Sequence, residues 1–237
     1  MSRENRIPVI IVGGFLGAGK TTLVNSLIGQ ADGRRIAALV NDFGALNIDA
    51  GLVVGVDGNT IALANGCICC TIRDDLARAC ADLVRQSQRP DVVIVELSGV
   101  SEPGPVLSTF LETELVQFFE LSGVVTVVDA LTWGQHGDGP ADLLGSQLRS
   151  ADVIALSKTD IADAMLTSNI LRDLKKAAPG TPVFPAPRGT FPLAMLLHEF
   201  QSGKRTVPIR VTDADHGLST WTWRERRLLS LPKLEDT

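Results

Sequence analysis

The 237-residue sequence lacks any apolar run of the roughly 18 residues that a membrane-spanning helix requires. Basic residues are also in deficit, because 22 Lys and Arg against 27 Asp and Glu leave a formal net charge of -5. Proteins that bind nucleic acids usually carry an excess of basic charge on one face. These shortages argue against a membrane or a nucleic-acid partner and predict a cytoplasmic protein.

Histidine and cysteine are scarce. The three histidines, His136, His198 and His216, are isolated, and a lone histidine is more often structural than a metal ligand. Three of the four cysteines crowd into residues 67–70, whereas a disulfide framework would be spread along the chain. Such clustering in a cytoplasmic protein favours metal binding. Cys80 stands apart in a helical pattern and is predicted to lie in the core.

Short apolar runs alternate with amphipathic segments. The runs cover residues 7–12, 36–40, 92–95, 124–128 and 153–156, and the helical patterns cover 20–29, 73–86, 141–150, 162–178 and 192–200. Runs that are apolar throughout fit strands buried on both faces of a parallel sheet. The alternation predicts an α/β fold with a doubly wound, mostly parallel sheet. We expect one domain over 1–203 and an extension over 204–237, with an edge strand at 218–223.

A glycine-rich loop follows the first apolar run. Residues 14–21 read Gly-Phe-Leu-Gly-Ala-Gly-Lys-Thr and open a helix, which is the context that a phosphate-binding P-loop requires. Backbone N–H groups of such a loop and the helix start cradle phosphate oxygens. We expect Lys20 to reach the β- and γ-phosphates and the Thr21 hydroxyl to bind Mg²⁺. The other expected nucleotide contacts are Gly14, Gly17, Ala18, Gly19 and Thr22.

An acidic residue ends the third apolar run, in the segment Glu96-Leu97-Ser98-Gly99. A carboxylate at the end of a buried strand beside a P-loop usually holds Mg²⁺, directly or through water. We therefore expect Glu96 to act with Lys20 and Thr21 in catalysis, and Gly99 to let the backbone approach the γ-phosphate. Asp129 ends another strand in the same way, but no second motif supports it, and a structural role is favoured.

The fifth apolar run ends in Ser157-Lys158-Thr159-Asp160. GTPases place Asn/Thr-Lys-x-Asp at such a strand end, where the aspartate accepts hydrogen bonds from N1–H and N2–H₂ of guanine. Adenine lacks this donor pair and would leave the carboxylate unpaired. Ser157 replaces the usual asparagine. The alternative is an ordinary helix N-cap; the P-loop upstream favours guanine recognition by Ser157, Lys158 and Asp160.

The segment Asn65-Gly66-Cys67-Ile68-Cys69-Cys70-Thr71 brings three thiols together. As thiolates, Cys67, Cys69 and Cys70 are soft ligands that suit Zn²⁺ or Cu⁺. A fourth ligand must come from elsewhere in the chain, from water or from a second chain, as in a homodimer. Such an incomplete set suits a transfer site better than a closed structural site. Asp42 follows another strand and is a further candidate metal ligand, with a solvated turn as the alternative.

Together, these motifs closely resemble the CobW-like GTPases, relatives of the urease and hydrogenase nickel-insertion GTPases. The resemblance covers residues 7 to about 200 and rests on Gly-Phe-Leu-Gly-Ala-Gly-Lys-Thr-Thr, Asn-Asp-Phe-Gly, Asn-Gly-Cys-Ile-Cys-Cys-Thr-Ile-Arg-Asp-Asp-Leu, Glu-Leu-Ser-Gly and Ser-Lys-Thr-Asp. It implies a P-loop NTPase fold and a GTP-dependent metallochaperone that delivers Zn²⁺ or Co²⁺ to a client metalloprotein.

Three features depart from the family pattern. Asp42 and Ala45 stand where the family usually has glutamates, and no histidine-rich tract is present in the sequence. Residues 216–224 resemble the first strand of the family's C-terminal domain, but the sequence ends soon after. We therefore expect that second domain to be largely absent, through truncation or because this is a minimal G domain.

Two other classes of function compete with a metallochaperone. One is a metal-binding regulator or buffer whose nucleotide state only controls partner binding, with little turnover of GTP. The other is a P-loop kinase, which would need an acceptor site. The sequence contains no catalytic base with a clear pocket signature, so the kinase is disfavoured.

Overall fold

A computed structural model describes residues 6–40, 61–62, 72–112, 114–134 and 141–198. In these ranges seven strands form one sheet in the order β3-β2-β4-β1-β5-β6-β7, and every neighbouring pair is parallel. The strands are β1 Ile7–Gly14, β2 Ile36–Val40, β3 Ile61–Ala62, β4 Val92–Glu96, β5 Phe119–Asp129, β6 Val153–Ser157 and β7 Val183–Ala186. The helices are α1 Lys20–Ile28, α2 Ile72–Arg85, α3 Pro103–Glu112, α4 Ala141–Arg149, α5 Ala164–Ala177 and α6 Leu193–His198, with 3-10 turns η2 Glu114–Gln117 and η3 Pro187–Gly189.

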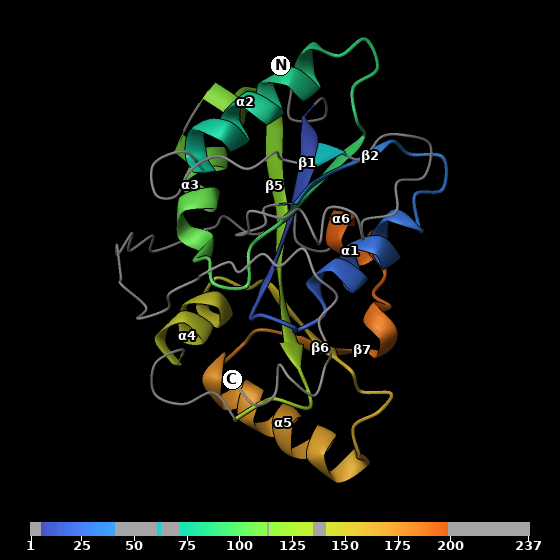
Figure 1. Cartoon of the computed structure of the whole chain (residues 1–237), viewed down its shortest axis with the longest axis vertical. Coiled ribbons are helices and arrows are strands. Elements are labelled where there is room, and N and C mark those ends of the chain that lie inside the picture. Colours follow the sequence, from blue (N-terminus) through green and yellow to red (C-terminus); the bar gives the residue numbers. More distant parts are fainter. Residues whose placement is uncertain (1–5, 41–60, 63–71, 113, 135–140, 199–237) are drawn as a thin grey trace, which may run out of the picture.

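Helices cover both faces of the sheet, because successive side chains of a strand point to opposite faces. Ile10 and Val12 of β1 pack in one cluster with α1 and α6. Val9 and Ile11 pack in a second cluster with α2 and α3, and α4 and α5 pack on the same face over β5 and β6. Figure 1 shows α1 and α6 together on one side of the sheet. The predicted doubly wound parallel sheet is therefore confirmed.

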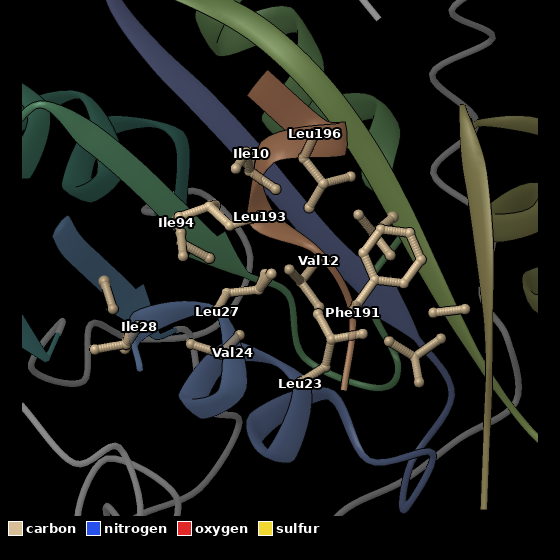
Figure 2. Close-up of a cluster of buried hydrophobic side chains, with 14 of the residues drawn as sticks. Ile10, Val12, Leu23, Val24, Leu27, Ile28, Ile94, Phe191, Leu193 and Leu196 are labelled. Atoms are coloured by element: carbon tan, nitrogen blue, oxygen red, sulfur yellow. The ribbon is translucent and has the colours of Figure 1, made fainter. Parts of the chain in front are cut away.

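The cluster beneath α1 fixes the loop that precedes this helix. Leu23, Val24 and Leu27 of α1 are fully buried against Ile10 and Val12 of the central strand. Phe191, Leu193 and Leu196 close the cluster from the segment around α6 (Figure 2). Burial of an aliphatic side chain of this size contributes about 1.5–3 kcal/mol, so the start of α1 is held firmly at the end of β1.

The strand order reverses at β1, with β4 and β2 on one side and β5 and β6 on the other. In doubly wound sheets, ligands bind outside the carboxyl ends of the strands at such a reversal. The register pairs Val12 with Glu96 and Asp129 with Ser157, so the ends of four strands meet at one edge. The fold thereby brings together the segments that the sequence singles out.

Some elements are additions to the predicted set. The edge strand β7 contains Pro185, and proline is tolerated at a sheet edge because its missing N–H leaves no ladder bond broken. Helix α3 begins Pro-Gly-Pro, where the backbone N–H groups lack helical partners in any case. The predicted edge strand at 218–223, and the boundary at 203, lie outside the described residues. Across the described ranges, none of the helices is both long and apolar enough to cross a membrane.

Candidate nucleotide-binding site

Glycines shape the loop between β1 and α1. Gly14, Gly17 and Gly19 have φ angles of 135°, 69° and 95°, which L side chains rarely adopt. A Cβ atom at Gly14 would overlap the carbonyl oxygen of Val127 in β5 and lie 3.1 Å from its carbonyl carbon. The loop therefore has the tight, backbone-lined curve of a phosphate cradle, and Gly19 is the N-cap of α1, where the positive end of the helix dipole favours an anion.

Two residues in the first turn of α1 carry the polar groups of this loop. Lys20 is buried, and its Nζ donates a hydrogen bond to the carbonyl oxygen of Phe15 at 3.0 Å. The Thr21 hydroxyl donates to Oε1 of Glu96 at 2.8 Å. Glu96 is only 4% exposed at the end of β4, so this contact joins the first turn of α1 to a strand end 75 residues away in sequence. A hydroxyl and a carboxylate together form a hard oxygen pair that suits Mg²⁺.

The segment after Glu96 packs closely on the P-loop. A Cβ atom at Gly99 would lie 2.6 Å from the backbone nitrogen of Leu16, so only glycine allows this approach. Gln147 of α4 is fully buried, and its Nε2 donates to the carbonyl oxygen of Ser101 at 3.1 Å. Gly99 thus brings its backbone to the P-loop itself, beside the expected phosphate position, and Gln147 ties the same segment to α4.

The segment after β6 is joined to the P-loop by Ser157. This residue is 3% exposed, and its hydroxyl donates to the carbonyl oxygen of Ala18 at 2.6 Å. Lys158 has a φ of 57°, and its Nζ lies 2.6 Å from Oδ2 of Asp129. Asp129 also accepts a hydrogen bond from the backbone N–H of Leu131 at 2.8 Å. The aspartate is therefore buried and positions Lys158, whereas a strand-end carboxylate without a role in the site would face solvent.

Asp160 lies at the outer end of the same motif, with a side chain that is 26% exposed. Its Oδ1 accepts a hydrogen bond from the backbone N–H of Arg188 at 3.3 Å, and its Oδ2 lies 3.5 Å from Nε of Arg188. Nothing in the sequence points to Arg188, because Ala-Pro-Arg-Gly reads as an ordinary turn. The structure thus adds Arg188, Asp129 and Gln147 to the residues around the site.

The predicted transition-metal ligands Asp42, Cys67, Cys69 and Cys70 lie outside the described residues. Among the residues that are described, no three His, Cys, Asp or Glu side chains come together as a candidate metal site. Cys80 is fully buried between α2 and the sheet, as predicted. Burial raises the pKa of its thiol from 9.0 to about 12, so this cysteine is an inert core residue.

The P-loop at a topological switch point, a buried lysine and a paired threonine and glutamate define a P-loop nucleotide-binding protein. Comparison with known protein families identifies the family within this class. The model of the family "CobW/HypB/UreG, nucleotide-binding domain" matches residues 8–185, and the chain belongs to this family.

Curated relatives and solved structures agree with this membership. The chain is 35% identical over 190 residues to the zinc chaperone CobW of a Sinorhizobium species, covering 69% of this chain and 54% of that protein. It is 34% identical to the zinc-regulated GTPase metalloprotein activator 1 of Schizosaccharomyces pombe, covering 72% and 43%. The crystal structure of the Zn(II)-bound YjiA GTPase from E. coli is 28% identical, with a TM-score of 0.61 and coverage of 81% and 61%. The chain thus spans about half the length of the curated relatives that it matches.

Proposed function

We propose that this protein binds and hydrolyses GTP and uses the cycle to deliver a transition-metal ion, Zn²⁺ or Co²⁺, to a client metalloprotein. The observation that carries the proposal is the 2.8 Å hydrogen bond between Thr21 and Glu96 beside a glycine-built phosphate cradle. Relatives named as zinc chaperones and as zinc-regulated GTPases support the metal-delivery step.

In this proposal most of the groups that bind the phosphates belong to the P-loop. Backbone N–H groups between Gly14 and Lys20 hold the phosphate oxygens, and the Lys20 ammonium neutralises charge on the β- and γ-phosphates. Thr21 and Glu96 would hold Mg²⁺, the threonine directly and the glutamate directly or through water. When bound, Mg²⁺ supplies charge neutralisation between the β- and γ-phosphates. The contribution of these groups is positioning and electrostatic stabilisation.

Guanine recognition is assigned to Asp160. Its two carboxylate oxygens accept N1–H and N2–H₂ of the base, while Lys158, held by Asp129 at 2.6 Å, covers the base plane. An acceptor left unpaired by adenine costs about 1–3 kcal/mol, which corresponds to roughly 5- to 150-fold weaker binding of ATP than of GTP. Asp160→Asn exchanges an acceptor for a donor and should shift the preference to xanthine nucleotides. Equal affinity of the wild type for ATP and GTP would refute this assignment.

Metal binding is assigned to the thiolates of Cys67, Cys69 and Cys70, with Asp42 as an additional ligand. If Asp42 does not bind the metal, the fourth ligand is another residue of the chain, water, or a residue of a second copy of the chain in a homodimer. In chain order the cysteines lie between β3 and α2, after the P-loop and before Glu96. Loops at the carboxyl ends of the strands gather around the ligand in this fold, so we expect the thiols to lie near the phosphate side of the nucleotide. GTP would hold the thiols in a converged geometry, and hydrolysis would loosen them.

The test is a titration with Zn²⁺ and with Co²⁺ in the presence of GDP or of a non-hydrolysable GTP analogue. The control is the Cys67/Cys69/Cys70→Ser variant. We expect a 5- to 150-fold difference in metal affinity between nucleotide states, the range typical of coupled sites. Unchanged affinity in the two states would rule out the delivery cycle, and equally tight binding by the variant would rule out the thiol site. Multiple turnover of GTP distinguishes this function from that of a regulator or buffer.

A further inference from the structure

Arg188 lies at the base-reading end of the site. It belongs to η3, directly after β7, and the register of β6 and β7 pairs Ser157 with Ala186. Arg188 and Asp160 therefore follow neighbouring strand ends at the same edge of the sheet. The Arg188 side chain is 86% exposed, so packing in the core does not account for its position.

The turn that presents Arg188 is fixed against α1. The backbone N–H of Thr190 donates to the carbonyl oxygen of Pro187 at 2.9 Å, and Arg188 and Gly189 have φ angles of 51° and 73°. A Cβ atom at Gly189 would lie 2.9 Å from the backbone nitrogen of Leu23 and 3.0 Å from the side chain of Thr22. Because the backbone has no room to shift toward the helix, movement at this position is left to the arginine side chain.

Two N–H donors of Arg188 face the two oxygens of the Asp160 carboxylate. The backbone N–H donates to Oδ1 at 3.3 Å, and Nε lies 3.5 Å from Oδ2. Guanine would present a similar pair of donors, N1–H and N2–H₂, to the same two oxygens. Arg188 thus presents to the Asp160 carboxylate the same pattern of two donors that guanine would present.

We propose that Arg188 is part of the guanine site, where it holds the Asp160 carboxylate until guanine displaces its side chain. The proposal rests on the proposed function, because it assumes that Asp160 reads the base. When only a fraction of the protein molecules is in the state that can bind a ligand, the apparent affinity for that ligand is reduced by the same fraction. Arg188 therefore acts as an internal competitor and weakens the binding of guanine nucleotides.

The test compares the equilibrium affinity for GDP of the wild type and of Arg188→Ala. We expect the variant to bind GDP about two- to fivefold more tightly, the range that an exposed ion pair supports. The gain should shrink at high ionic strength, because salt screens exposed ion pairs. Arg172→Ala, which removes another exposed arginine from α5, is the control for net charge and should leave the affinity unchanged.

A second comparison separates this competition from a general attraction between Arg188 and the phosphates. In an Asp160→Asn background, measured with xanthosine diphosphate, the amide cannot form the ion pair, and Arg188→Ala should bring no gain. An equal gain in both backgrounds, or weaker GDP binding by Arg188→Ala in the wild-type background, would overturn the proposal. Because Arg188 already has a φ of 51°, alanine introduces no new demand on the backbone, and the variant should fold.

Failure of this inference is distinguishable from failure of the proposed function. A wild-type protein that binds ATP as well as GTP would remove guanine recognition altogether. A wild-type protein that prefers GTP, together with an Arg188→Ala variant of unchanged GDP affinity, would remove only the role of Arg188.

Discussion

Gly14→Ala tests the geometry of the phosphate cradle. The φ of 135° at Gly14 is unfavourable for alanine, and such backbone strain costs about 1–3 kcal/mol. The new methyl group would also overlap the carbonyl oxygen of Val127 in the neighbouring strand, and overpacking of this kind costs about 1–3 kcal/mol more. We therefore expect the free energy of unfolding to fall by about 2–6 kcal/mol, measured by urea denaturation.

Gly33→Ala is the matched control for this substitution. Gly33 has a φ of 81°, but no heavy atom lies within 4 Å of its added Cβ. It should show only the conformational cost of about 1–2 kcal/mol. If the P-loop moves to relieve the overlap at Gly14, GDP affinity should fall at least about tenfold in Gly14→Ala and stay unchanged in Gly33→Ala. Equal losses of stability in the two variants, with unchanged GDP affinity in both, would refute the steric reasoning.

Three further substitutions probe the site and the core. Lys20→Ala should slow GTP hydrolysis by about 10²–10³-fold in a folded protein, as judged by circular dichroism, whereas the exposed Lys176→Ala should not. Ser157→Ala removes the 2.6 Å hydrogen bond to Ala18 and should cost about 0.5–1.5 kcal/mol of stability with a several-fold loss of GDP affinity; unchanged affinity would mean that Ser157 does not brace the P-loop. Because the Cys80 pKa is raised from 9.0 to about 12 by burial, the unfolded thiol ionises first, and the free energy of unfolding should fall by up to about 1.4 kcal/mol per pH unit within that window. A Cys80→Ala variant with the same slope in urea denaturation would exclude this cause.

The sequence predicts most of the nucleotide site because each part is a local motif at a strand end. In a parallel sheet these ends lie on one edge, so Thr21 and Glu96 meet as soon as β1 and β4 are neighbours. The same reasoning places Ser157 beside the P-loop. To predict these two contacts, only the order of the strands in the sheet is needed, and not the packing of the helices.

Contacts made by turns and helix faces could not be predicted in this way. The pairing of Arg188 with Asp160 depends on how η3, which follows β7, packs against α1. A short sequence motif does not predict this packing. Gln147 reaches Ser101 only because α4 packs over that segment. Asp129 is an intermediate case, because the register of β5 and β6 sets it opposite Ser157 and hence beside Lys158.

The two ends of the candidate site, where the base and the phosphates are proposed to bind, are joined to the fold by different contacts. Ser157 ties the segment proposed to bind the base to the P-loop at Ala18, and η3 packs on the first turn of α1. The segment after β4 instead approaches the P-loop at Leu16 through Gly99. GTP and GDP have the same base and differ only in the γ-phosphate. In the described part of the chain, a response that distinguishes them is therefore expected to begin at the contact between Leu16 and Gly99 rather than at Asp160.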